Sequence, residues 1–248
     1  MTDALTHHVV GLAERMGFDR VGVVSASIAF PEERYADWLA NHGHAEMDYM
    51  ADHIDLRHKP GGLVEGAQSI LCLAVSYWPY GEWMSDAGIA MFARGRNYHK
   101  VLKQRCHRLM DTIRETQPEF EGRAFVDSGP LLERRLAERS GVGFRGHNGC
   151  LITEEYGSYV LLCEIVCNLP LVPADPPPMT CQGCGQCILA CPTGALQPDG
   201  RVDARLCRSY LTIEHRGEID PALWPKMGDC VFGCDTCQTI CPHNQSAG

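Results

Sequence analysis

The chain has 248 residues, of which 45% are apolar and 21% are charged, and its formal net charge is −9. This length suits one large domain, or a core domain with a small appendage. The N-terminal segment lacks the basic-then-apolar plan of a secretory signal, and no apolar run approaches the roughly 18 residues of a membrane span. The acidic balance argues against a protein coated by nucleic acid. We therefore expect a soluble, cytoplasmic protein.

Hydrophobic spacing predicts a mixed α/β domain in the first part of the chain. In chain order we expect a helix at 5–16, a strand at 18–24, a helix at 32–41, a strand at 68–77, a helix at 97–115, a strand at 123–126, a helix at 131–139, and strands at 149–153 and 158–166. Pro79 is expected to stop the second strand, and Pro130 to be the first residue of the fourth helix.

A proline-rich segment divides the chain. Residues 169–179 include five prolines in eleven positions, which suits neither a helix nor a central strand. We expect one domain at 1–168, a linker at 169–179 and a second domain at 180–248.

Nine of the 14 cysteines lie in this second domain. A secreted disulfide scaffold is one explanation, but such scaffolds are usually short and come with an export signal. In a reducing cytosol, clustered thiols are more typical of metal ligands. The cysteines at 181, 184, 187 and 191 with Pro192 follow the C-x2-C-x2-C-x3-C-P run of bacterial ferredoxins, in which the fourth cysteine binds the other cluster.

A second run repeats the pattern at Cys234, Cys237 and Cys241, with Cys207 as the natural replacement for its missing member. The sequence therefore predicts two [4Fe–4S] clusters, one held by Cys181, Cys184, Cys187 and Cys241, the other by Cys191, Cys207, Cys234 and Cys237. Cys230 is left over as a spare thiol. The alternative is a pair of zinc ribbons, which need neither the third cysteine nor the trailing proline.

The chain resembles the cobalamin-dependent epoxyqueuosine reductases, which complete the queuosine nucleoside of transfer RNA anticodons. The resemblance extends from Gly17 to Asn244. It is carried by residues 94–100, 126–134, 141–144 with His147 and Asn148, 155–158, 210–214 and 233–242.

This resemblance implies an α+β fold, with a nitroreductase-like cobalamin domain followed by a ferredoxin-like domain with two [4Fe–4S] clusters. Electrons would pass through the clusters to base-off cobalamin, and the epoxide of epoxyqueuosine in the tRNA anticodon would lose its oxygen as water. It further implies a low-potential electron donor of the flavodoxin or ferredoxin type, no membrane and a monomer.

The resemblance also implies roles for individual residues. Asp127 would donate a proton, which near neutral pH requires a pKa raised by burial. From the residues alone, the simpler interpretation is that Asp127 closes a turn before the next helix. The cobalamin site would include Arg57, Asp127, Arg134, His147, Asn148, Leu151 and Ser209, although Arg57 and Arg134 also suit surface ion pairs.

Residues 91–110 include six basic residues and no acidic one. Such a helix face is either simply solvated or a contact for RNA phosphates. With the resemblance, we expect RNA contacts from Arg94, Arg96, Tyr98, Lys100 and Lys103, with Tyr98 stacking on an anticodon base.

Three features depart from the family's pattern. Asn97 stands where the family usually has Asp, and His147 stands where Lys is common. The chain also ends at Gly248, whereas many family members continue into a helical-repeat domain that grips the tRNA, so we expect either a natural short form or a truncated chain.

Two other functions remain open at the level of sequence. One is a cobalamin and iron–sulfur reductase of a small molecule, similar to reductive dehalogenases, which a closed apolar pocket would favour. The other is a non-catalytic electron carrier, in which replacing Asp127 would affect no turnover. A basic groove beside Asp127 would favour the tRNA-modifying reductase.

Overall fold

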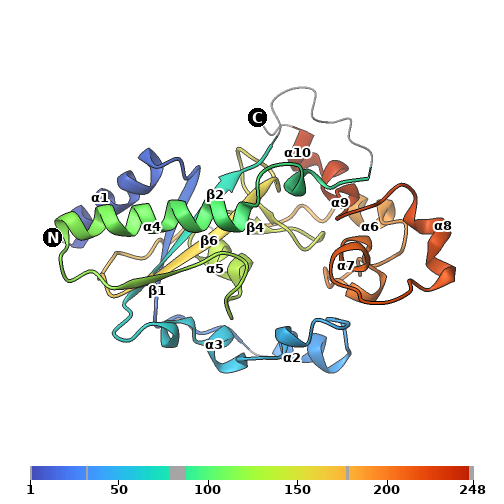
Figure 1. Cartoon of the computed structure of the whole chain (residues 1–248), viewed down its shortest axis with the longest axis horizontal. Helices are drawn as coiled ribbons and strands as arrows, with labels where there is room; N and C mark the ends of the chain where they lie inside the picture. The colour runs from blue at the N-terminus through green and yellow to red at the C-terminus, as the bar shows by residue number, and fades with distance from the viewer. Residues whose placement is uncertain (1, 32, 79–87, 177–178, 246–248) are drawn as a thin grey trace.

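The computed structural model describes residues 2–31, 33–78, 88–176 and 179–245. It contains a sheet domain with helices on both faces and a module of short helices beside it (Figure 1). The expected helix start at Glu32 and the expected strand stop at Pro79 lie outside the described residues.

The sheet has four antiparallel strands in the order β1-β2-β6-β3. These are β1 (Arg20–Ser25), β2 (Ser69–Ser76), β6 (Val160–Cys167) and β3 (Gly122–Phe125). The central strands β2 and β6 pair over eight residues, from Ser69 opposite Cys167 to Ser76 opposite Val160. The four strands expected from sequence at these places are confirmed, each within two residues at either end.

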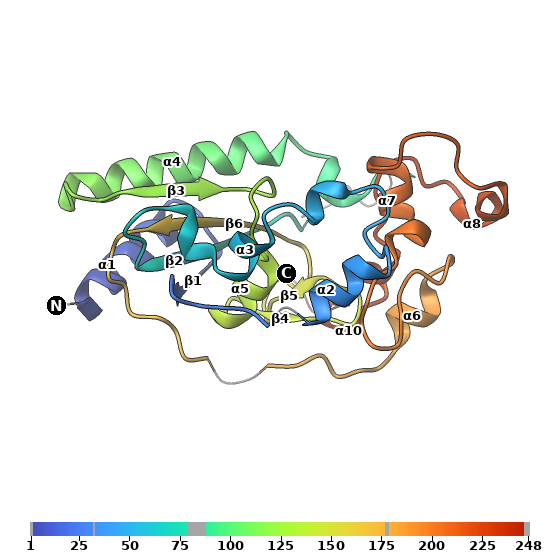
Figure 2. The same ribbon diagram turned by 90° about the horizontal axis from the view of Figure 1, so that it is seen from below.

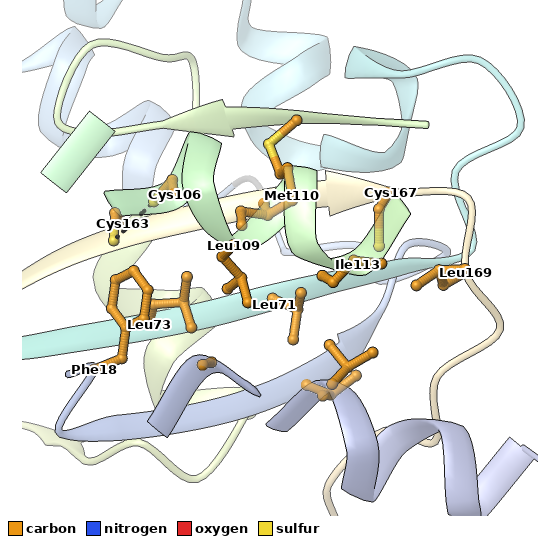
Figure 3. Close-up of a cluster of buried hydrophobic side chains, with 14 of the residues drawn as sticks. Phe18, Leu71, Leu73, Cys106, Leu109, Met110, Ile113, Cys163, Cys167 and Leu169 are labelled. Carbon is orange, nitrogen blue, oxygen red and sulfur yellow. Dashed lines mark hydrogen bonds between the residues drawn. The ribbon is translucent and has the colours of Figure 1, made fainter. Parts of the chain in front are cut away.

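Alternate residues of β2 enter two hydrophobic clusters on opposite faces of the sheet, because successive side chains of a strand point to opposite sides. Leu71 and Leu73 pack beneath α1 (Thr2–Arg15) and α4 (Tyr98–Thr116), as Figure 3 shows for α4. Ile70 and Cys72 pack on the other face against α5 (Glu133–Arg139). The strand is therefore buried on both sides, which explains its uninterrupted apolar sequence.

The basic helix α4 begins after Asn97, whose side chain accepts a hydrogen bond from the backbone N–H of Lys100 at 3.1 Å. Asn is among the best residues at this capping position. The departure from Asp at position 97 therefore leaves the start of the helix intact.

Pro130 is not the first residue of α5, contrary to the expectation from sequence. The helix begins at Glu133, and Leu131 N–H instead closes a turn onto the carbonyl of Gly129. The chain needs these extra residues because Asp127 adopts a left-handed backbone conformation (φ 51°) that continues neither the strand nor a helix.

Short elements link the sheet to the module. They are α2 (Glu33–Ala40), η1 (Asp48–Met50), α3 (Ile54–His58), η2 (Pro60–Leu63), η4 (Met91–Ala93) and a two-stranded ribbon of β4 (Phe144–Arg145) and β5 (Leu151–Ile152). Strand β5 corresponds to the strand expected at 149–153. Its partner β4 was not expected.

The module consists of α6 (Gln186–Ala190), η5 (Ala204–Leu206), α7 (Arg208–Ile213), η6 (Pro221–Leu223), α8 (Trp224–Met227), α9 (Thr236–Thr239) and α10 (Pro242–Gln245). The described residues between β6 and α6, 168–176 and 179–185, contain no helix or strand (Figure 2). Within the described residues, no helix combines the length and apolar character needed to cross a membrane.

Leu109 tests the packing of α4 on the sheet because its side chain is fully buried there. Leu109→Ala should lower the free energy of unfolding by about 2–5 kcal/mol, through lost apolar burial and the cavity it leaves. Lys103→Ala, at an exposed position of the same helix, should change it by less than about 0.5 kcal/mol. Urea denaturation of the cofactor-loaded chain, followed by circular dichroism, measures both; equal effects would contradict this packing.

Candidate functional site

The four thiols expected to hold the first cluster lie around one cavity. Cys181, Cys184, Cys187 and Cys241 line it together with the β4–β5 loop, including His147 and Asn148. Burial raises the pKa of Cys187, and the neighbouring thiols of Cys181 and Cys241 raise it further. The structure thus brings Cys241, from the second run, to the three cysteines of the first, as the crossed assignment requires.

The thiols expected to hold the second cluster also converge. Cys207 lies within electrostatic range of Cys234 and Cys191, whose charges add to the effect of burial in raising its pKa. Backbone N–H groups at the start of α7, those of Tyr210 and Ser209, act in the opposite direction. Such N–H groups stabilise a thiolate, which is the form that binds iron.

Two further thiols border this second set. Cys230 donates to the carbonyl of Gly233 at 2.7 Å and lies beside Cys234. Cys150 lies beside Cys237, and the hydrogen bond between these two thiols is the largest cause of the raised pKa of Cys237. In the described part of the chain, no group of three or more His, Cys, Asp or Glu side chains has the geometry of a single-ion site.

A buried polar network joins the module to the sheet domain. Asn244 Oδ1 accepts the N–H of Ser158 at 2.6 Å, and Asn244 Nδ2 donates to the Ser158 hydroxyl at 2.8 Å. That hydroxyl in turn donates to Gln238 Oε1 at 2.9 Å. Gly157 permits this approach, since a Cβ there would lie 1.9 Å from Asn244 Oδ1.

Asp127 lies on the loop between β3 and α5, with 57% of its side chain exposed. Its Oδ2 accepts a hydrogen bond from the hydroxyl of Tyr98 at 2.5 Å and lies 3.4 Å from Nε2 of His99. Its backbone N–H donates to Glu133 Oε1 at 2.9 Å. A positive φ at a non-glycine residue stores strain and is frequent at functional sites.

Tyr49 lies within electrostatic range of both Asp127 and the module. This tyrosine of η1 is half exposed, and burial is the largest cause of its raised pKa. The next causes are the charges of Glu214, in the module, and Asp127, in the sheet domain. Carboxylates from both parts of the chain therefore act on a single side chain.

The residues expected at the cobalamin site differ in burial and in the groups they contact. Arg57 is buried, and its guanidinium donates to the carbonyls of Tyr49 at 2.7 Å and Asp52 at 3.0 Å, so it supports the η1 segment. Arg134 is exposed and donates to the carbonyl of Gly149. Ser209, at the start of α7, is half-buried next to Cys207.

The other expected cobalamin residues lie at the β4–β5 ribbon. His147 and Asn148 line the cavity of the first thiol set, and Asn148 Nδ2 also donates to the carbonyl of Cys237 at 3.4 Å. The Leu151 side chain belongs to the hydrophobic cluster beneath α5. These positions place His147 and Asn148 nearer to the predicted cluster ligands than sequence reasoning anticipated.

Of the residues expected to contact RNA, Tyr98 also contacts Asp127. Arg94, Arg96 and Tyr98 line a hollow of about 410 Å³ together with Arg105, while Lys100 and Lys103 are exposed on α4. The Tyr98 ring stacks on His99 at 4.0 Å between centroids. Tyr98 is thus part of the Asp127 site, a connection that sequence spacing does not reveal.

Comparison with known proteins decides the family. Residues 57–128 match the family described as Epoxyqueuosine reductase QueG, DUF1730, and residues 180–244 match a 4Fe-4S double cluster binding domain. The epoxyqueuosine reductase of Alicycliphilus denitrificans is 41% identical over 98% of this chain and 71% of its own length. The chain belongs to the epoxyqueuosine reductase family.

Solved epoxyqueuosine reductase structures share the fold. One from Bacillus subtilis, with its catalytic aspartate loop swung out of the active site, has a TM-score of 0.87 at 32% identity. Another, with an epoxyqueuosine-modified tRNA-Tyr stem loop, has a TM-score of 0.85 at 31% identity. Each match covers 98% of this chain, which spans 66% of those chains.

Exchanging single cysteines tests the ligand sets. Cys207→Ser should lower the iron content of the anaerobically reconstituted chain from about eight to about four atoms, because the second cluster loses a ligand. Cys230→Ser, beside the same thiol set, should retain about eight. Iron and acid-labile sulfide analysis measures both. Loss of iron from Cys230→Ser, with Cys207→Ser unaffected, would contradict the assignment.

Proposed function

We propose that this chain reduces epoxyqueuosine to queuosine in the tRNA anticodon, with two [4Fe–4S] clusters and base-off cobalamin as cofactors. The observation that carries the proposal is that Asp127 of the sheet domain and Glu214 of the cluster module both lie within electrostatic range of Tyr49, in a chain of this family. In this proposal, electrons reach the substrate from the module and protons reach it from the Asp127 loop.

The chemistry at Asp127 is protonation. When bound, cobalamin would supply the electrons that break the carbon–oxygen bond, and the epoxide oxygen then needs protons to leave as water. Asp127 carries one proton to that oxygen as a general acid. The Tyr98 hydroxyl and His99 ring hold the carboxyl in place from α4.

The surface around Asp127 suits a nucleic-acid substrate. Arginines 94, 96 and 105 line the hollow next to Tyr98, and such side chains bind phosphate oxygens and position RNA. Asp127 is more than half exposed, contrary to the burial expected from sequence, so its carboxyl is open to a nucleoside presented by a large substrate. We further propose that the protein is cytoplasmic and receives its electrons from a low-potential donor protein. The linker at residues 169–179 would separate its two domains.

Asp127→Asn tests the proposed role of Asp127. The amide keeps the size of the side chain but cannot donate a carboxyl proton, so conversion should slow by about 10²–10⁴-fold while clusters and corrin stay bound. The assay uses the reconstituted chain, a low-potential reductant and an epoxyqueuosine-bearing anticodon stem-loop, with mass spectrometry of the nucleosides.

Asp111→Asn is the matched control, because Asp111 is an exposed residue of α4 that pairs with Arg114. It should convert the stem-loop at the wild-type rate. A wild type that binds corrin but converts no stem-loop would contradict the proposed substrate. Equal rates for Asp127→Asn and the wild type would remove Asp127 from the reaction.

A further inference from the structure

Two acidic side chains behind Asp127 have no part in the chemistry described so far. Glu164 lies in the middle of β6 with 1% of its surface exposed, and neither of its oxygens has a well-formed hydrogen bond within the described residues. Glu133 is the first residue of α5, which packs against the sheet next to β6 (Figure 1). A buried carboxyl without a hydrogen-bond donor keeps its proton.

The two carboxyls connect Asp127 to the interior of the sheet domain. Glu133 Oε1 accepts the backbone N–H of Asp127 at 2.9 Å, so its carboxyl is fixed next to the Asp127 loop. Glu164 lies within electrostatic range of Glu133, and each of the two carboxyls affects the pKa of the other. The order from the exposed loop inward is therefore Asp127, Glu133 and Glu164.

The surroundings keep protons on this pair near neutral pH. Burial, followed by the charge of Asp127, raises the pKa of Glu133 to about 7. Burial and the adjacent Glu133 raise the pKa of Glu164 well above its ordinary value. The other ionisable groups around the pair are Arg134 on α5, Cys72 on β2, Tyr98 and Cys106 on α4, and Cys163 on β6.

Among these neighbours, Arg134 is the one cation, and it favours the ionised form of Glu133. Glu164 therefore stays protonated near neutral pH, because its pKa is raised well above its ordinary value. Glu133 gains and loses its proton in this range. A group that titrates near the working pH is the most effective at passing a proton on.

The stoichiometry of the proposed reaction requires a second proton. Removing the epoxide oxygen as water consumes two protons, and a single carboxyl carries only one. After its first donation, Asp127 is a carboxylate on a loop whose backbone already contacts Glu133.

We propose that Glu133, backed by Glu164, returns a proton to Asp127 during each turnover. The O–H bond of Glu133 breaks and an O–H bond forms on the Asp127 carboxylate, which then protonates the leaving oxygen. Glu133 regains its proton from Glu164 or from solvent, and no electron moves in this step. Glu133 does not touch the substrate; it is a positioning and relay residue, and the inference rests on the proposed function.

Glu133→Gln tests the relay, because the amide oxygen can still accept the Asp127 N–H but the side chain can release no carboxyl proton. We expect about 10²-fold slower single-turnover conversion of the stem-loop by the reconstituted chain. The wild-type rate should fall as pH rises through about 7, where Glu133 loses its proton, and this decline should be absent in Glu133→Gln. Glu133→Asp, which keeps a carboxyl, should recover part of the rate and the decline.

Glu138→Gln is the matched control on the same helix, where the Glu138 carboxylate pairs with Arg145 at 3.0 Å. It should leave both the rate and its pH dependence unchanged. A wild-type rate and pH profile in Glu133→Gln would overturn the relay.

A readout without substrate separates this inference from the proposed function. Infrared difference spectra of the reconstituted chain between pH 6 and pH 8, a range of about one unit on either side of the Glu133 pKa, should show a protonated carboxyl that disappears and is missing in Glu133→Gln. The absence of such a signal in the wild type would overturn the relay. Failure of the wild type to convert the stem-loop, with this signal present, would overturn the proposed function and leave the proton pair in place.

Discussion

Hydrogen bonds among Ser158, Gln238 and Asn244 join the cluster module to the sheet domain, and all three side chains are buried. Removing one partner would leave buried polar groups unsatisfied, at about 1–3 kcal/mol each. A second contact lies on the other side of the module, where the Glu46 carboxylate accepts the N–H of Arg216 and the Tyr210 hydroxyl, both at 3.1 Å. The module is therefore fixed at two separate places, and its thiol sets have defined positions relative to the Asp127 loop.

This arrangement separates the routes of electrons and protons. The thiol sets belong to the module. Asn148 and Cys150, from the edge of the sheet domain, lie beside them. The carboxyls of Asp127, Glu133 and Glu164 belong to the sheet domain and lead inward from its surface. Glu214 of the module and Asp127 of the sheet domain both lie within electrostatic range of Tyr49, so the proposed routes of electrons and protons approach each other there.

Much of the fold could be predicted from sequence, because its signals are local. The apolar run of β2 and the buried stripe of α4 indicate their elements directly. The cysteine spacing indicates the thiol sets, since a ferredoxin run gathers three ligands within one loop. The start of α5 was predicted wrongly, because Pro130 is a favourable first residue only where the preceding turn leaves room for a helix.

The proton pair could not be predicted, because Glu133 and Glu164 are brought together by the packing of α5 on β6. The one available signal for this pair was Glu164, a charged residue within the apolar strand at 160–167. Its partner Glu133 is 31 positions away in the chain. The hydrogen bond from the Tyr98 hydroxyl to Asp127 could not be predicted for the same reason, because the two residues are 29 positions apart in the chain. Arg57 was open to a surface ion pair, yet it is buried against backbone carbonyls.

Anomalous X-ray diffraction from crystals of the reconstituted chain, collected at the iron and cobalt edges, tests the central claim most directly. We predict iron peaks within the two sets of four thiols and a cobalt peak between the Asp127 loop and the cluster module. A cobalt peak remote from Asp127, or crystals with both clusters that take up no cobalt, would contradict the account.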